Sequence, residues 1–267
     1  MSWPHTRRLR KRVRWLGRLR RRKWRRPDDP VSGRRRALRE EADYWADWIE
    51  ARGGTFADEF GYRFDPEAEV VDRALREVLA STTGRVSILD VGAGPASMVG
   101  CRFDGRSLDV IAVDPLADKY NVFLDEAGLV PPIRTEAVEG EKLVERFGRD
   151  RFDVVYSRNA LDHTVDPVIV VEQMLAVTRS GGYLVFRHGR REAISESYVQ
   201  LHQWNLDELE GDFLIWRPGA ETNMTKELAA RAHVRCWIED EDGETVVTVI
   251  RKYGSSVQDR GGQEARD

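Results

Sequence analysis

ILDVGAGP at residues 88–95 and VIAVD at residues 110–114 are the two stretches that decide the fold. The first is a short apolar run that breaks at a Gly-x-Gly turn, where the missing side chains let backbone approach a ligand closely. The second apolar run ends on Asp114, a carboxylate placed to accept both hydroxyl protons of a ribose. Together they predict the nucleoside-binding half of an α/β sheet.

Asp90 lies two residues before Gly92 and indicates which nucleoside is bound. A dinucleotide site places a helix N-terminus against a pyrophosphate, and an acid at this turn would repel that anion. S-adenosylmethionine carries a cationic amine and sulfonium and no phosphate, so it tolerates the acid. A nicotinamide dehydrogenase is the competing interpretation, but Met98 and Val99 stand where its third glycine is expected.

Four motifs in order resemble the class I S-adenosylmethionine-dependent methyltransferases, in their small-molecule, type 11-like branch. DVGAG at 90–94 stands at the family's first motif and Asp114 at its ribose-binding acid. FDVVYSRNALDH at 152–163 is similar to the fourth-strand motif, and RSGGYLVF at 179–186 to the turn into strand five. The resemblance implies a Rossmann-like α/β fold, with a mostly parallel seven-stranded sheet, an antiparallel last strand and helices on both faces.

Strand and helix patterns alternate along the middle of the chain. We expect strands at 86–91, 109–113, 132–137, 152–157 and 183–188, and helices after the first turn and at 116–127, 141–147 and 167–179. Apolar runs separated by helical crossovers indicate a parallel sheet covered on both faces. Later strands are expected at 212–217, 233–239 and 245–252, which suits a sheet completed by an antiparallel hairpin.

The chain divides into four expected parts. These are a basic arm at 1–33 that is disordered or binds a surface, an N-terminal helical cap or lid at 34–64, a methyltransferase domain at 65–253, and a flexible tail at 254–267. In the cap, a helix is expected from about Arg35 to Arg52, ended by glycines. Asp65 and Pro66 are expected to open the next helix as its N-cap and first residue.

The net charge of −3 conceals a polarised chain. Residues 1–36 hold 16 Lys/Arg against two Asp, and the rest holds 27 Lys/Arg against 44 Asp/Glu. The basic stretch at residues 7–26 is either a solvated tail of mutually repelling charges or an anchor to an anionic membrane surface. Nucleic acid is a less favoured partner because the body is acidic. Two cysteines without ligand-like spacing and the lack of a long apolar run fit a cytoplasmic protein, peripheral at a membrane if the arm binds one.

Ligands of open parallel sheets bind at the carboxyl ends of the strands, near the topological switch point. The expected cofactor-binding residues are Asp90, Gly92, Gly94, Asp114, Leu116, Glu139 and Asn159. Leu116 is expected to form an apolar wall for adenine. The resemblance implies an acid that accepts from the adenine amino group, and Glu139 stands there with Glu141 close by. A helix N-terminal charge is the other explanation for Glu139.

Polar groups also follow the fourth and fifth strands. The expected catalytic residues are Asp162, His163 and His202, and the expected substrate-binding residues are His188, Glu192, Trp204 and Asn205. An imidazole can take a hydroxyl proton near neutral pH, so His163 or His202 is the candidate base. A packed histidine and a buried polar network bracing the last strands are the structural alternatives. No metal is expected because no tight metal motif is present, although His188, Glu192 and His202 with Asp162 could hold a divalent ion.

These features predict a methyltransferase that uses S-adenosylmethionine to methylate an oxygen of a polar small molecule or glycan by in-line displacement. Orientation of the reactants alone can supply ~7–11 kcal/mol. Base methylation of nucleic acid is disfavoured, because no Asp/Asn-Pro-Pro-aromatic run and no Pro-Cys pair is present. The alternatives are a non-catalytic scaffold of this fold tethered by its basic arm, and a nucleic-acid methyltransferase recruited by that arm.

Overall fold

The computed structural model describes residues 30–239 and 244–254, with side chains from residue 33 onward. The basic stretch at 7–26 and tail residues 255–267 lie outside the described residues. Among the helices that are described, none has the length and apolar character needed to span a bilayer.

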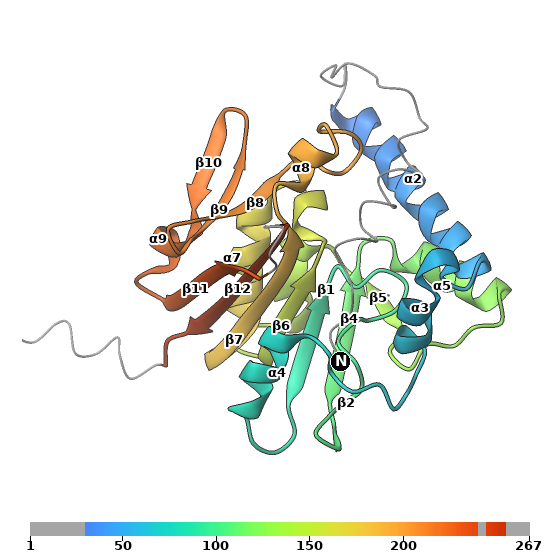
Figure 1. Ribbon diagram of the computed structural model, residues 1–267, viewed down its shortest axis with the longest axis horizontal. Helices are drawn as coiled ribbons and strands as arrows, with labels where there is room; N and C mark the ends of the chain where they lie inside the picture. Colours follow the sequence, from blue (N-terminus) through green and yellow to red (C-terminus); the bar gives the residue numbers. More distant parts are fainter. Residues whose placement is uncertain (1–29, 240–243, 255–267) are drawn as a thin grey trace, which may run out of the picture.

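A seven-stranded sheet forms the centre of the molecule (Figure 1). In spatial order its strands are β11 (Ala232–Ile238), β12 (Thr245–Lys252), β7 (Thr178–Gly189), β6 (Phe152–Arg158), β1 (Ser87–Val91), β4 (Asp109–Asp114) and β5 (Thr135–Ala137). The five strands from β7 to β5 pair in parallel, whereas β12 runs antiparallel to β7 and β11. The predicted sheet with its antiparallel last strand is therefore confirmed.

The connections place a ligand crevice between β1 and β6. The chain leaves β1 toward β4 on one side, and leaves β6 toward β7 on the other. The carboxyl ends of β1 and β6 thus flank the point where the strand order reverses, which is where open α/β sheets bind their ligands.

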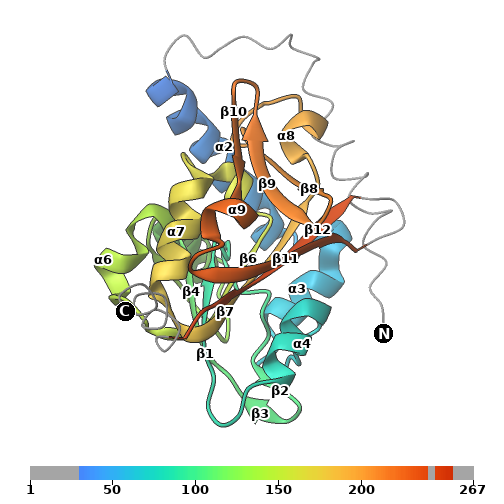
Figure 2. The same cartoon turned by 90° about the vertical axis from the view of Figure 1, so that its left-hand side faces the viewer.

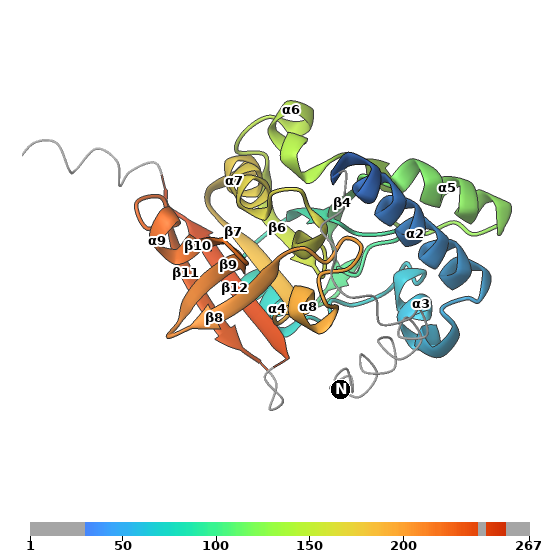
Figure 3. The ribbon, with the colours of Figure 1, turned by 90° about the horizontal axis from the view of Figure 1, so that it is seen from above.

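Helices cover both faces of the sheet, and Figure 3 shows α6 (Leu143–Phe147) and α7 (Pro167–Val177) on one side and α4 (Arg73–Ala80) on the other. Successive side chains of a strand point to opposite faces. In β1, Leu89 joins the core cluster beneath α7, and Ile88 joins the cluster beneath α4. Continuous apolar runs are what a sheet buried on both faces requires.

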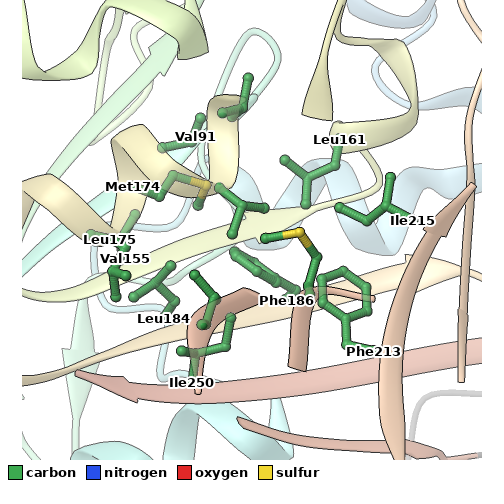
Figure 4. Close-up of a cluster of buried hydrophobic side chains, with 14 of the residues drawn as sticks. Val91, Val155, Leu161, Met174, Leu175, Leu184, Phe186, Phe213, Ile215 and Ile250 are labelled. Atoms are coloured by element: carbon green, nitrogen blue, oxygen red, sulfur yellow. The ribbon is translucent and has the colours of Figure 1, made fainter. Parts of the chain in front are cut away.

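A second sheet of three strands, β8 (Asn205–Leu209), β9 (Asp212–Arg217) and β10 (Ala220–Asn223), is inserted between β7 and β11. Figure 2 shows it with α9 (Met224–Leu228) beside β11 and β12. Its inner face extends the larger core cluster, where Phe213 packs on Phe186 with ring centroids 6.0 Å apart (Figure 4). The strand expected at 212–217 is confirmed. Its partners β8 and β10 were not expected, because they are short and largely polar.

The N-terminal elements form a layer over one end of the sheet. They are α2 (Pro30–Glu50), the 3-10 turn η1 (Gly54–Phe56) and α3 (Ala57–Arg63). Trp48 and Ile49 of α2 share a core cluster with Tyr120 and Leu124 of α5 (Ala117–Glu126). This packing holds α2 across the carboxyl ends of β1 and β4, as Figure 1 shows.

The prediction of a helix after β1 is wrong. Residues 92–101 form an irregular loop, followed by a hairpin of β2 (Arg102–Phe103) and β3 (Arg106–Ser107). Gly92, Gly94 and Gly100 all have positive φ, which a right-handed helix does not allow. The side chain of Ser97 bonds to Asp90 and to the amide of Val99, and these bonds fix the loop without a helical turn.

The prediction that a helix begins at Asp65 and Pro66 is also wrong. Asp65 accepts from the amide of Glu67 in a local turn, so the chain does not enter a helix there. The helix α4 begins at Arg73, where Asp72 caps it by accepting from the amide of Leu75 at 2.9 Å.

Candidate active site

A cavity of about 1250 Å³ opens at the carboxyl ends of the central strands, beneath α2 and α3. Most of the residues expected at the site line it. They are Asp90, Gly92, Gly94, Asp114, Leu116, Glu139, Asn159, Asp162, His163, His188, Glu192 and His202. The strand order thus gathers into one place residues that are spread over more than 100 positions of the sequence.

Gly92 brings the ends of β1, β4 and β6 together. Its amide donates to the carbonyl of Val113 at 2.8 Å, and its φ is +75°. A Cβ at this position would lie 2.2 Å from the Cβ of Ala160, the residue that follows Asn159 beyond β6. The glycine is therefore required by close packing of the protein itself, and its backbone faces the cavity.

Asp114 ties the end of β4 to the glycine turn. Its Oδ1 accepts from the amide of Leu116 at 2.9 Å, and its Oδ2 accepts from the amide of Gly94 at 3.2 Å. Each carboxylate oxygen has two lone pairs, so acceptor capacity remains for a ligand. Burial raises the pKa of Asp114 to about 7, against the two amide hydrogen bonds, which lower it.

Asp90 lies beneath the glycine turn and is buried. Ser97 donates to its Oδ2 at 2.7 Å. Burial raises the pKa of Asp90 to about 6, and the bond from Ser97 acts in the opposite direction. This carboxyl holds the loop in shape, because the loop folds back onto it through Ser97.

Arg63 and Trp45, neither of which was among the expected site residues, cover the glycine turn. Arg63 donates to the carbonyl of Ala93 at 3.0 Å and to that of Ala96. Its guanidinium carbon lies 5.4 Å from the ring centroid of Trp45. The Trp45 ring in turn lies where a Cβ on Gly94 would be 3.0 Å from it. The four-residue spacing of Glu59 and Arg63 is typical of an ion pair along a helix. It does not predict that Arg63 also donates to backbone carbonyls of the distant loop after β1.

Three side chains meet at the other end of the cavity. Nδ1 of His202 lies 2.7 Å from Oδ2 of Asp162, and Nε2 of His163 lies 3.2 Å from that nitrogen and 3.5 Å from that oxygen. Asp162 and His163 belong to the 3-10 turn η3 (Leu161–His163) after β6, whereas His202 follows α8 (Glu192–Ser195). The guanidinium of Arg34 from α2 donates to the carbonyl of His163 at 3.0 Å. The three residues expected to be catalytic are thus brought together.

The charges of this cluster are strongly coupled. Burial opposes ionisation of Asp162, but the neighbouring His163 charge and the hydrogen bond from His202 outweigh it and hold its pKa below the usual range. Burial also favours neutral His202, yet the hydrogen bond to Asp162 and its charge raise the His202 pKa to about 9. The carboxylate is therefore ionised at neutral pH.

His188, at the end of β7, is buried and lines the same cavity. Neither ring nitrogen has a hydrogen-bond partner among the described residues. Burial lowers the pKa of His188 to about 4, so the ring is neutral at pH 7. A buried imidazole with free hydrogen-bonding capacity is costly to the fold and is a reason to look for a ligand here.

Glu139 and Asn159 lie at the rim of the cavity and are exposed. Glu139 forms an ion pair with Lys142 at 2.9 Å, beside the 3-10 turn η2 (Gly140–Lys142). Asn159 has a φ of +50°, and its side-chain oxygen accepts from the amide of Gly189 at 3.0 Å. This bond links the ends of β6 and β7.

Trp204 and Asn205 do not line the cavity. Trp204 packs in the larger core cluster, with the guanidinium carbon of Arg217 4.1 Å from its ring centroid. Asn205 is fully buried, accepts from the amide of Ile194 and donates to the hydroxyl of Tyr198. Of the four residues expected to bind the acceptor, His188 and Glu192 line the cavity. Trp204 and Asn205 instead brace the inserted sheet.

Residues 89–186 match the family model of a methyltransferase domain. Two uncharacterised methyltransferases of Mycobacterium sp., strains KMS and MCS, are each 27% identical over 129 residues, which is 48% of this chain and 49% of theirs. The chain spans about half the length of the curated relatives it matches. Residues 89–186 are thus similar in sequence to a methyltransferase domain.

Two solved structures are also similar to the chain. The first is 1,6-didemethyltoxoflavin-N1-methyltransferase from Burkholderia thailandensis, with bound 1,6-didemethyltoxoflavin and S-adenosylhomocysteine. It is 16% identical with a TM-score of 0.47, over 85% of this chain and 93% of that one. The second is a complex of the Haloferax volcanii Trm112 methyltransferase activator with a methyltransferase. It is 13% identical with a TM-score of 0.45, over 81% of this chain and 97% of that one.

The residues that line the cavity fit S-adenosylmethionine. Asp114 has free lone pairs at the carboxyl end of β4, next to an apolar wall at Leu116. The turn at Gly92 and Gly94 presents backbone to the cavity, and no helix N-terminus follows it to attract a phosphate. These features suit a ribose and an uncharged adenine beside a ligand that has no phosphate.

Proposed function

We propose that this protein transfers the methyl group of S-adenosylmethionine to an oxygen of a polar small molecule or glycan. The observation that supports the proposal is that two groups of residues, one suited to a nucleoside and one suited to a polar acceptor, line a single cavity. Asp114 and the glycine turn open into it from β4 and β1, and the cluster of Asp162, His163 and His202 opens into it beyond β6. A nucleoside end and a polar acceptor end thus lie side by side across the strand-order reversal.

The volume of the cavity supports a reaction between two ligands. A pocket for one small molecule typically has ~300–1,000 Å³, and this cavity has about 1250 Å³. Cofactor and acceptor could therefore be held together, which is the condition for an in-line displacement.

When bound, S-adenosylmethionine supplies an electrophilic methyl carbon on a sulfonium. The protein then has to bind, orient and deprotonate the acceptor. In this proposal Asp114 accepts from the ribose hydroxyls, His188 offers its free ring nitrogens to the acceptor, and His163 takes the acceptor's proton. His202 is the less suitable base, because its raised pKa keeps the ring protonated at neutral pH. A positioned base contributes ~10²–10⁴-fold in rate.

The polar side chains at the acceptor end of the cavity favour a sugar-like or polyol acceptor over an apolar one. His188 and Glu192 lie at the acceptor end with the three clustered side chains, and all five offer hydrogen-bonding groups. In the same proposal the basic stretch at 7–26 tethers the protein to an anionic membrane surface. Loss of vesicle binding on deletion of residues 1–29, at unchanged cofactor affinity, would support that tether.

The test begins with calorimetric titration of the purified full chain with S-adenosylhomocysteine, with NAD as the comparison ligand. We expect micromolar binding of S-adenosylhomocysteine and none of NAD. Labelled methyl transfer to a panel of sugars and polyols then follows, and mass spectrometry locates the methyl group on the product.

Each other outcome favours a different function. Binding without turnover on any acceptor favours the non-catalytic scaffold, and methyl transfer to DNA or RNA favours a nucleic-acid enzyme. A folded, ligand-free protein that binds no S-adenosylhomocysteine contradicts the proposal outright.

A further inference from the structure

Three potential metal-ligand atoms converge at the acceptor end of the cavity. They are Oδ2 of Asp162, Nε2 of His163 and Nδ1 of His202, and all three lie within 4.8 Å of one another. The three separations are 2.7, 3.2 and 3.5 Å. Each residue directs one donor atom to the same point, from two segments about 40 positions apart in the sequence.

These separations match the spacing of ligands around one ion. Atoms ~2.1 Å from a shared metal are ~3.0 Å apart at right angles and ~3.4 Å apart at the tetrahedral angle. Of the two distances from Nε2 of His163, 3.2 Å lies between these values and 3.5 Å lies ~0.1 Å above the larger one. The carboxylate–imidazole pair at 2.7 Å has hydrogen-bond length and would need to open by only ~0.3 Å.

Hydrogen bonds alone explain the close approach of these three side chains less well than a shared metal ion does. Nδ1 of His202 carries at most one hydrogen, and that hydrogen is directed to Asp162 at 2.7 Å. Nε2 of His163 nevertheless approaches the same nitrogen to 3.2 Å. A cation at the centre would satisfy all three atoms through their lone pairs at once.

A second observation, independent of the cluster, points to a ligand at this place. His188 is 2% exposed, lines the same cavity, and has no hydrogen-bond partner at either ring nitrogen among the described residues. Asp162, His163 and His202 line that cavity as well. The wall beside the cluster is therefore prepared for a polar ligand.

We propose that Asp162, His163 and His202 bind one divalent first-row transition-metal ion, with open coordination positions that face the cavity. Two imidazoles and one carboxylate are the donor set of such ions, in zinc enzymes and in non-haem iron sites. Mg²⁺ and Ca²⁺ prefer oxygen ligands, so they are disfavoured. The substrate class that fits is an acceptor whose hydroxyl, or pair of adjacent oxygens, occupies the open positions.

The metal site changes the role assigned to the two histidines. An imidazole nitrogen bound to an ion has no lone pair left for a proton, so His163 and His202 then orient the acceptor through the metal. Metal binding itself does not depend on the proposed methyl transfer. The two proposals can therefore fail separately.

The test is metal binding by the untagged full chain, stripped with a chelator and checked by elemental analysis. We expect one Co²⁺ per chain, with visible absorption bands that Zn²⁺ abolishes by displacement. The His163→Ala/His202→Ala double variant should bind no Co²⁺. His233→Ala is the matched control, because His233 is an exposed histidine of β11, and it should bind Co²⁺ as the wild type does.

Circular dichroism is used to check that each metal-free variant is folded. The inference is overturned if the folded wild type binds neither Co²⁺ nor Zn²⁺ at micromolar concentration, if it binds Mg²⁺ in preference to both, or if the double variant keeps its ion. Binding of S-adenosylhomocysteine by the metal-free wild type is measured in the same samples, so a failure of the metal site is distinguished from a failure of the cofactor site.

Discussion

The backbone amide of Gly94 donates to the carboxylate of Asp114 at 3.2 Å. This single bond joins the glycine turn after β1 to the acid at the end of β4. The two parts of the nucleoside signature are 20 residues apart in the sequence, and the structure makes them one unit. A change at either residue is therefore expected to move the other.

Replacing Asp114 tests the ribose contact. We expect Asp114→Asn to weaken S-adenosylhomocysteine binding by roughly 10- to 100-fold, because hydrogen bonds to a charged group contribute ~1.5–3 kcal/mol. Isothermal titration calorimetry measures the effect. Asp118→Asn is the matched control, since Asp118 is an exposed acid at the start of α5, and its affinity should be unchanged. Equal affinities for wild type and Asp114→Asn would rule out the contact.

The pKa of Asp114 also predicts a pH dependence. Burial raises this pKa from 3.8 to about 7, so the folded protein releases the proton at a higher pH than the unfolded chain does. Ionisation of Asp114 therefore costs folding stability as pH rises from about 4 to 7. Ribose hydroxyls donate to the ionised form, so affinity for S-adenosylhomocysteine should rise with pH and level off above about 7.

Calorimetric titrations from pH 5.5 to 8.5 measure this profile. Asp90 titrates nearby with a pKa of about 6, so the difference between wild type and Asp114→Asn isolates the contribution of Asp114. Parallel profiles for the two proteins would contradict the assignment.

Gly92 is expected to be irreplaceable for a steric reason. In Gly92→Ala the new Cβ would lie 2.2 Å from the Cβ of Ala160. Gly105 has the same φ of +75° but nothing within 4 Å of its added Cβ, so Gly105→Ala measures the backbone strain alone. We expect Gly105→Ala to cost ~1–2 kcal/mol of unfolding free energy, and Gly92→Ala to cost a further ~1–3 kcal/mol from overpacking.

Urea unfolding measures both costs. Ala160→Gly in the Gly92→Ala background removes the contact and should recover the overpacking part but not the strain. No recovery in the double variant would mean that Ala160 is not the source of the cost.

The sequence predicted β1, β4, β6 and β7 because each contains a run of apolar residues, whereas β5 (Thr135–Ala137) has none and was placed by the alternation of strands and helices. Leu89 and Ile88 serve opposite faces of the sheet, and both had to be apolar. The antiparallel hairpin of β11 and β12 was also expected, and the strand at 245–252 was recognised by the alternation of Val246, Thr248 and Ile250. Short polar strands such as β8 and β10 carry no such signal, since their pairing is set by contacts with β9 and the core beneath it.

The loop after β1 shows where local pattern fails. A helix is the usual sequel to a Gly-x-Gly turn in a nucleoside-binding fold. Here Arg63, about 30 residues upstream, takes the loop carbonyls that a helix would otherwise bond, and Ser97 reaches back to Asp90. Such long-range partners are set by tertiary packing, so no window of sequence around the loop reveals them.

The site residues also differ in whether a local sequence pattern or a long-range contact places them at the cavity. Asp114 ends β4, and Asp162 and His163 lie in the short turn η3 after β6, so strand ends were enough to place them at the cavity. His202 belongs to a loop, and its approach to Asp162 depends on how α8 and the inserted sheet fold back. Its spacing from His163 fits no metal motif, which is why Asp162, His163 and His202 were expected from sequence as catalytic residues and not as a set of metal ligands.

Trp204 provides the test that separates bracing from acceptor binding. Its ring is buried in the larger core cluster and covered by Arg217, and its Nε1 donates to the carbonyl of Val165 at 3.3 Å. Trp204→Ala should therefore lower the unfolding free energy by ~3–5 kcal/mol, while the folded protein keeps its S-adenosylhomocysteine affinity. Leu209→Ala, at an exposed position of β8, should change stability by less than ~0.5 kcal/mol. An acceptor-binding role for Trp204 would give the opposite result, with little change in stability and a raised KM for the acceptor.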